Sequence, residues 1–111
     1  MASILLIDPN ENHARELGDF LERQRFSVQI CKHGTDGVNE LRRKGTQFDI
    51  VIIEMTGDCR KAWEVFGHIR RHMGSKATTP GLICTCRGYR GPQMRMRVER
   101  LGAKLIYERT E

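Results

Sequence analysis

Hydrophobic and polar residues follow two different periods along this chain, and the period changes repeatedly. Continuous apolar runs of strand length, such as 3–7 (SILLI) and 49–53 (DIVII), are typical of strands covered on both faces. Between these runs, apolar residues recur every three or four positions, as on the buried side of a helix. The pattern therefore predicts strands and helices in alternation.

The chain divides into nine predicted elements joined by short polar connections. In chain order they are a strand over 3–7, a helix over 11–25, a strand over 26–30, a helix ending near 44, a strand over 49–53, a helix over 61–73, a strand over 81–86, a helix beginning near 92 and a strand over 102–109. Asn10 is expected to cap the first helix, whose inward stripe is Ala14, Leu17, Phe20 and Leu21. Such alternation specifies an α/β fold, a parallel sheet wound on both faces.

The length of 111 residues fits one domain over 1–111 with one core. The composition, 39% hydrophobic and 30% charged, is typical of a soluble globular protein and excludes a disordered chain. The apolar runs are too short to span a bilayer, and Asp8 follows the start too closely for a signal peptide. We therefore expect a cytoplasmic protein with no membrane contact.

The formal net charge is +5, and much of the basic excess lies in the last quarter of the chain. Arg90, Arg95, Arg97 and Arg100 could form a patch that meets nucleic acid or an acidic protein. Aromatic residues for base stacking are scarce there. Nucleic-acid contact is therefore an alternative rather than the main interpretation.

Cysteine and histidine spacing gives no strong metal signature. Cys84 and Cys86 share one strand face, no CxxC pair occurs, and small core residues are the preferred interpretation. His68 and His72, with Glu64 one turn earlier, could hold a surface metal, but a solvated helix face is preferred.

Polar side chains stand where four of the predicted strands end. Asp8 follows the first strand, Glu54 the third, Thr85 lies at the end of the fourth, and Arg109 at the end of the fifth. In open parallel sheets, function gathers at the carboxyl ends of the strands. Two acids, a hydroxyl and a cation are therefore expected at one edge.

These residues, in this order, resemble the receiver domain of two-component response regulators over nearly the whole chain. ILLID resembles the first strand and acidic turn, FDIVIIEM the strand that ends in the phosphorylated Asp, TPGLICT the strand with the switch hydroxyl, and GAKLIYER the fifth strand. The resemblance implies a five-stranded, flavodoxin-like sheet in the order 2-1-3-4-5. The pattern here is (βα)4β, with the fifth helix short or absent.

In that family, two acids and the acceptor Asp hold Mg²⁺, and a hydroxyl and a lysine then bind the phosphoryl group. This chain departs from the pattern at four places. Pro9 replaces the second acid, Glu54 the acceptor, Arg109 the lysine, and Ile106, with Tyr107 adjacent, the aromatic switch residue. Asp49 and Asp58 are poorly placed as alternative acceptors.

Two of these departures bear on chemistry. Mg²⁺ prefers octahedral oxygen ligands, so Pro9 weakens a site at Asp8 and Glu54, and we expect Mg²⁺ binding to be weak or absent. Glu54 extends its carboxylate by one methylene, and about 1 Å of misplacement can cost a hundredfold in rate. Glu54 is therefore expected to imitate a phosphorylated Asp. Arg109 could hold it in a bidentate pair, or both side chains could be solvated.

The resemblance and the departures together predict an atypical receiver that works through protein–protein interaction without phosphorylation. Its partner would be another protein or an attached effector domain. A weak conventional phosphoacceptor is the alternative. Enzymatic turnover is not expected, because no nucleophile–base pair or Gly-rich phosphate loop follows any strand.

A fifth helix would normally cover one face of the last two strands, and the chain ends two residues after Arg109. We expect alternate residues among Leu82, Cys84, Leu105 and Tyr107 to be open, as a sign of an interface or of a piece of a longer protein. A homodimer through the fourth helix and fifth strand is expected, with Val98, Leu101, Leu105 and Tyr107 in the interface.

Overall fold

The computed structural model describes residues 1–44, 48–55, 60–72, 81–87, 92–100 and 102–108. Within these ranges the side chains of 44, 60–62, 70, 72, 87, 105, 107 and 108 are not described. The elements are β1 (Ser3–Ile7), α1 (Glu11–Arg23), β2 (Ser27–Cys31), α2 (Gly34–Lys44), β3 (Ile50–Met55), α3 (Arg60–His72), β4 (Gly81–Arg87), α4 (Pro92–Arg100) and β5 (Ala103–Glu108).

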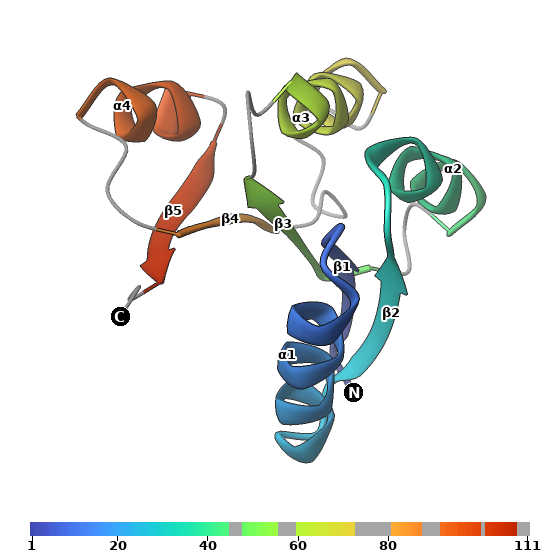
Figure 1. Cartoon of the computed structure of the whole chain (residues 1–111). Helices are drawn as coiled ribbons and strands as arrows, with labels where there is room; N and C mark the ends of the chain where they lie inside the picture. The colour runs from blue at the N-terminus through green and yellow to red at the C-terminus, as the bar shows by residue number, and fades with distance from the viewer. Residues whose placement is uncertain (45–47, 56–59, 73–80, 88–91, 101, 109–111) are drawn as a thin grey trace.

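The five strands form one parallel sheet in the order β2-β1-β3-β4-β5, which confirms the predicted topology. Helix α1 covers one face of the sheet, whereas α2, α3 and α4 lie on the other (Figure 1). The central strands β1 and β3 are the most apolar because helices cover both of their faces.

Each face of the sheet has its own core. The larger core lies beneath α2, α3 and α4 and includes Leu5, Val51 and Phe66, all fully buried. The smaller core lies beneath α1 and is built on Ile4, Leu6, Ala14 and Ile52. Alternate residues of one strand therefore serve opposite cores, as the strand period requires.

Helix α1 is turned differently from the expectation, because Phe20 is 51% exposed. Ala14 and Gly18 are the buried positions of this helix. At Gly18 the helix lies so close to β2 that an added Cβ would sit 3.0 Å from Ile30 Cδ1. Close packing at the small residues turns Phe20 to the flank of the helix. The buried stripe of the helix is therefore narrower than predicted, because it does not include Phe20.

The expectation that Leu82 and Cys84 are open is wrong. Leu82 and Cys84 are buried beneath the α3 and α4 side of the sheet. The opposite face carries Ile83, which is half-buried, and Ile106, which is 49% exposed. Alternate residues of β4 do face opposite sides of the sheet, as predicted. The covered side, however, is the one that carries Leu82 and Cys84.

Val98 also corrects the predicted interface, because its side chain is fully buried in the larger core. Helix α4 turns Val98 toward the sheet, so it contributes to the fold rather than to a surface. Leu101 and the side chains of Leu105 and Tyr107 lie outside the described part of the chain.

The cysteines that the structure describes are buried thiols: Cys31, Cys84 and Cys86. All three belong to the larger core, as the preferred interpretation of Cys84 and Cys86 required. Within the described ranges, no helix has the length and hydrophobicity needed to cross a membrane.

Candidate functional site

The candidate site lies at the carboxyl ends of β1, β3 and β4. Ile7 of β1 pairs with Ile53 of β3. The residues that follow them, Asp8 and Glu54, therefore lie side by side at the carboxyl ends of neighbouring strands. Glu54 in turn pairs with Thr85 across β3 and β4. The structure thus brings together three of the four predicted strand-end residues.

Glu54 and Thr85 form the buried half of the site. Their exposed fractions are 6% and 8%, and the Thr85 hydroxyl donates a hydrogen bond to Glu54 Oε2. A carboxylate taken out of water is costly unless hydrogen bonds replace its hydration. Thr85 supplies one such bond directly across the sheet.

Asp8 is held by the turn that leads into α1. Its carboxylate is 1% exposed, and Oδ1 accepts the backbone N–H of Asn10 at 2.9 Å. The Asn10 side chain accepts the backbone N–H of His13 at 3.0 Å, and so caps the helix as predicted. The other Asp8 oxygen, Oδ2, contacts His13 Nδ1. The turn is therefore closed by three successive hydrogen bonds.

His13 is a site residue that the sequence reasoning missed. Its side chain is 15% exposed, and one donor atom from each of Asp8, His13 and Glu54 lies within 4.8 Å of the others. The signal that could have found it is positional. A histidine in the first turn of a helix that directly follows an acidic strand end faces back toward that acid.

The resemblance to receiver domains implies a Mg²⁺ ion at this site, so the ligands that the cluster offers are compared with those that Mg²⁺ prefers. Mg²⁺ requires near-octahedral oxygen coordination, whereas this cluster offers two carboxylates and an imidazole nitrogen. Pro9, in the turn itself, supplies no side-chain oxygen. Two carboxylates are a number that Mg²⁺ sites commonly use, but the nitrogen donor makes the cluster a better match for a transition-metal ion than for Mg²⁺.

Arg109 and Asp58 lie outside the described residues, so the Glu54–Arg109 pair stays a prediction. Asp49 precedes β3 at the opposite edge of the sheet, where its carboxylate accepts the Ser3 N–H at 2.7 Å. His68 is buried, so the preferred interpretation of a solvated helix face is wrong at this residue. Glu64 is exposed, and the side chain of His72 is not described.

The basic residues of α4 are exposed, and Arg97 and Arg95 make contacts within the chain. The Arg97 guanidinium lies 4.6 Å from the centre of the Trp63 ring, and Arg95 lies 3.8 Å from Glu99. The stacking of Arg97 on Trp63 joins α4 to α3. Arg90 lies outside the described residues.

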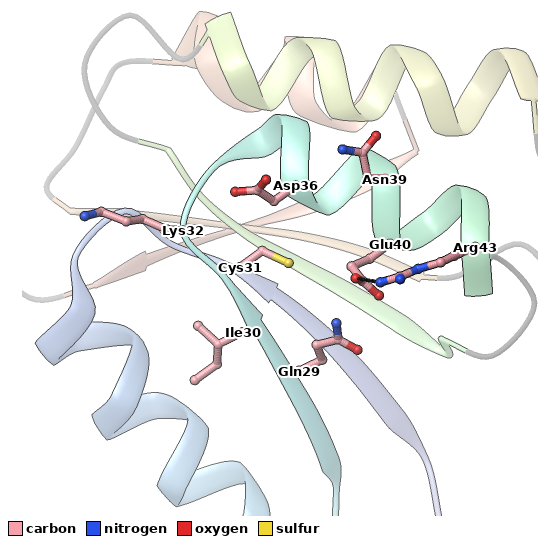
Figure 2. Close-up of a pocket in the computed structure, with 8 residues that line it drawn as sticks. All are labelled: Gln29, Ile30, Cys31, Lys32, Asp36, Asn39, Glu40 and Arg43. Carbon is pink, nitrogen blue, oxygen red and sulfur yellow. Dashed lines mark hydrogen bonds and ion pairs between the residues drawn. The ribbon is translucent and has the colours of Figure 1, made fainter.

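A separate groove of about 620 Å³ runs between β2 and α2 (Figure 2). Its lining residues are Gln29, Ile30, Cys31 and Lys32 of β2 and the following turn, and Asp36, Asn39, Glu40 and Arg43 of α2. Arg43 pairs with Glu40 in its wall. Burial raises the pKa of the Cys31 thiol, and the negative charges of Glu40 and Asp36 raise it further. Charges of both signs line the groove, so its charge favours neither an anionic nor a cationic ligand.

The chain is similar to solved structures of receiver domains. The chain matches a response regulator receiver domain protein from Clostridium thermocellum with a TM-score of 0.81 and 18% identity, covering 99% of this chain and 82% of that one. It matches the non-phosphorylated HemR receiver domain from Leptospira biflexa with a TM-score of 0.78 and 21% identity, covering 99% and 82%.

The pseudo-receiver domain of the CikA protein also matches, with a TM-score of 0.72 and 14% identity over 100% of this chain and 86% of that one. No protein-family model matches the chain, and no curated protein matches it significantly. The chain therefore has the receiver fold, including the predicted strand order.

Proposed function

We propose that this chain is a two-component-type signalling domain that acts through protein–protein contacts and without phosphorylation. It is a binding module, not an enzyme, and its partner is another protein or an attached effector domain. The hydrogen bond from the Thr85 hydroxyl to the buried Glu54 carboxylate carries the proposal. The fold of the solved receiver domains that the chain resembles supports it.

The physical argument concerns what the Thr85 hydroxyl binds. In the family that the chain resembles, this hydroxyl is drawn toward a phosphoryl group on the acceptor. Here the Glu54 carboxylate already occupies that role, because its additional methylene carries the charge to Thr85. A hydrogen bond to a charged group contributes roughly 1.5–3 kcal/mol. The hydroxyl is thereby held in one orientation in the chain as synthesised.

The same geometry argues against Glu54 as a nucleophile. Glu54 is 6% exposed, and one of its oxygens is engaged by Thr85. Attack on a phosphodonor requires in-line access, and Glu54 would first have to break this bond and move toward solvent. Phosphorylation of Glu54 is therefore the less favoured candidate.

Mass spectrometry of the intact chain, after incubation with acetyl phosphate and excess Mg²⁺, tests the proposal. We expect no increase in mass, while a phosphorylatable receiver domain treated in parallel gains one phosphoryl group. Glu54→Gln, which removes the candidate acceptor, controls for phosphorylation elsewhere. A phosphoryl adduct that maps to Glu54 would overturn the proposal.

We further propose that the chain forms a homodimer through the flank of α4 and β5, with the basic residues of α4 at its rim. Met96 of α4 is 54% exposed and the neighbouring Arg95 and Arg100 are also exposed. An exposed apolar side chain among arginines suits a contact that is apolar at its centre and charged around it.

A further inference from the structure

The cluster of Asp8, His13 and Glu54 contains the three kinds of side chain that most often bind divalent transition metals apart from thiolates. They come from the end of β1, the first turn of α1 and the end of β3. Asp8 and Glu54 are buried, and His13 is mostly buried. Two buried carboxylates face one imidazole, so the cluster has a strongly negative local charge when the imidazole is neutral.

We propose that Asp8, His13 and Glu54 form a binding site for a divalent transition-metal ion of the Zn²⁺ class, and not for Mg²⁺. A neutral imidazole and carboxylates together suit zinc, nickel, copper or cobalt. Mg²⁺ and Ca²⁺ prefer sites composed of oxygen ligands only. His13 is the residue that determines this preference.

Asp8 and His13 are oriented before any metal arrives. Asp8 is fixed through Oδ1 by the backbone N–H of Asn10, which leaves Oδ2 directed at His13. The Asn10 side chain fixes the backbone of His13 at the start of α1. Hydrogen bonds of this kind hold metal ligands in place and typically change metal affinity by about 10–100-fold.

Glu54 is oriented in the same manner by the Thr85 hydroxyl. Zinc ligands lie about 2.0–2.2 Å from the ion, so the three donors must lie roughly 3.2–3.6 Å from one another. They already lie within 4.8 Å of one another, and small side-chain rotations would bring them to this spacing. The metal would replace the direct contact between His13 Nδ1 and Asp8 Oδ2.

Access to the cluster is open from one side. His13 is 15% exposed, and Asp8 forms part of the wall of a surface depression of about 280 Å³ with Glu11, Arg15 and Lys32. Three protein ligands leave one position of a tetrahedral ion for water. Binding would neutralise the two carboxylates and fix α1 against the ends of β1 and β3.

Calorimetric titration with Zn²⁺ and with Mg²⁺ tests the site, using the whole chain, His13→Ala and the matched control His33→Ala, which changes an exposed histidine outside the cluster. We expect one Zn²⁺ per chain, bound at least 100-fold more tightly than Mg²⁺. His13→Ala should weaken Zn²⁺ binding at least 10-fold, and His33→Ala should leave it unchanged. Equal Zn²⁺ affinity in His13→Ala and the unaltered chain, or Mg²⁺ affinity equal to that of Zn²⁺, overturns the proposal.

A second measurement on the unaltered chain keeps the test decisive if His13→Ala fails to fold. Cu²⁺ broadens NMR signals of nearby protons, so it should broaden the His13 ring signals at substoichiometric concentration while His33 and His68 stay sharp. Co²⁺ should give a visible spectrum without a thiolate charge-transfer band. Broadening only at other histidines, or a thiolate band, contradicts the assignment.

The metal proposal concerns the same side chains as the proposed function but does not rest on it. A metal titration without binding leaves the phosphorylation result untouched. A phosphoryl adduct on Glu54 leaves the Zn²⁺ affinity measurement untouched. The two experiments therefore fail independently.

Discussion

A buried acid at the end of β3 determines the chemistry of this sheet edge. Glu54 is too long to be a simple replacement for Asp, and its carboxylate reaches the hydroxyl of Thr85 on the neighbouring strand. The contact is between paired positions in the sheet, so its geometry follows from the register of β3 and β4. A single methylene thereby allows a side-chain hydrogen bond between the two strands at their carboxyl ends.

Removal of this hydroxyl should destabilise the protein. Thr85→Val preserves the side-chain volume but leaves the buried Glu54 carboxylate without the Thr85 donor. We expect the free energy of unfolding to fall by about 1–3 kcal/mol in urea titrations. Thr85→Ser retains the hydroxyl and should lose clearly less stability. Equal losses in the two variants would show that the hydrogen bond contributes nothing.

Cys31 should make stability depend on pH in the alkaline range. Burial, assisted by Glu40 and Asp36, raises the pKa of the folded thiol above its ordinary value of 9.0. The unfolded chain loses this proton first, so the stabilisation is fully present below 9.0 and is lost as the pH rises through the folded pKa. In urea titrations at pH values above 9.0, the free energy of unfolding should fall more steeply with pH for the unaltered chain than for Cys31→Ala. Parallel curves would contradict it.

His13 shows where residue-level reasoning from the sequence stopped. The strand-end acids could be found because they follow apolar runs directly, and strand direction alone brings Asp8 and Glu54 to one edge. A helical residue reaches that edge only through the geometry of the turn between β1 and α1. No periodicity in the sequence encodes that turn.

Among the elements, the strands were the most predictable and the orientation of the helices the least. β1 has the predicted bounds, since a continuous apolar run ends sharply at Asp8. α1 ends at Arg23, and Phe20 lies on its flank. Helix ends and helix rotation depend on packing against the sheet, and Gly18 sets that packing for α1.

Helix α2 approaches β1 closely at a glycine, which gives a test of packing. A Cβ at Gly37 would overlap the buried Ile7 side chain, with Ile7 Cγ1 only 2.9 Å away. We expect Gly37→Ala to lower the free energy of unfolding by about 1–3 kcal/mol, because the core must shift.

Gly67→Ala in α3 is the matched control. There the new Cβ would meet only the end of the Arg71 side chain, at 3.1 Å, which can move aside. Alanine favours helix over glycine by about 1 kcal/mol, so Gly67→Ala should be neutral or stabilising. Thermal unfolding of both variants checks the pair, and similar losses in both would contradict close packing at Gly37.

At the scale of the whole molecule, the fold was predictable because every level of the pattern agreed. Apolar strands, amphipathic helices and short connections all specify one parallel sheet, and the structure has that sheet. The exposed surface was not predictable to the same degree. Which face of β4 and β5 is covered depends on where α3 and α4 lie, so Leu82 is buried while Ile106 is exposed.

Association of two chains is the prediction that belongs to this scale. If the flank of α4 forms the dimer contact, Met96→Asp should shift sedimentation-velocity profiles toward monomer. Phe20→Asp changes an equally exposed apolar residue on α1 and should leave the profiles unchanged. A monomer at all concentrations, or dissociation caused by Phe20→Asp alone, rules out this interface.

The central claim is that the Glu54 carboxylate already fills the place of a phosphoryl group beside Thr85. Beryllofluoride, a phosphoryl mimic that binds acceptor carboxylates, tests it when added with Mg²⁺ during NMR of the amide signals. We predict no shift of the Thr85 signal or of β5 signals in the unaltered chain. Saturable shifts at Thr85 that disappear in Glu54→Gln would show that the site still accepts the mimic and would contradict the claim.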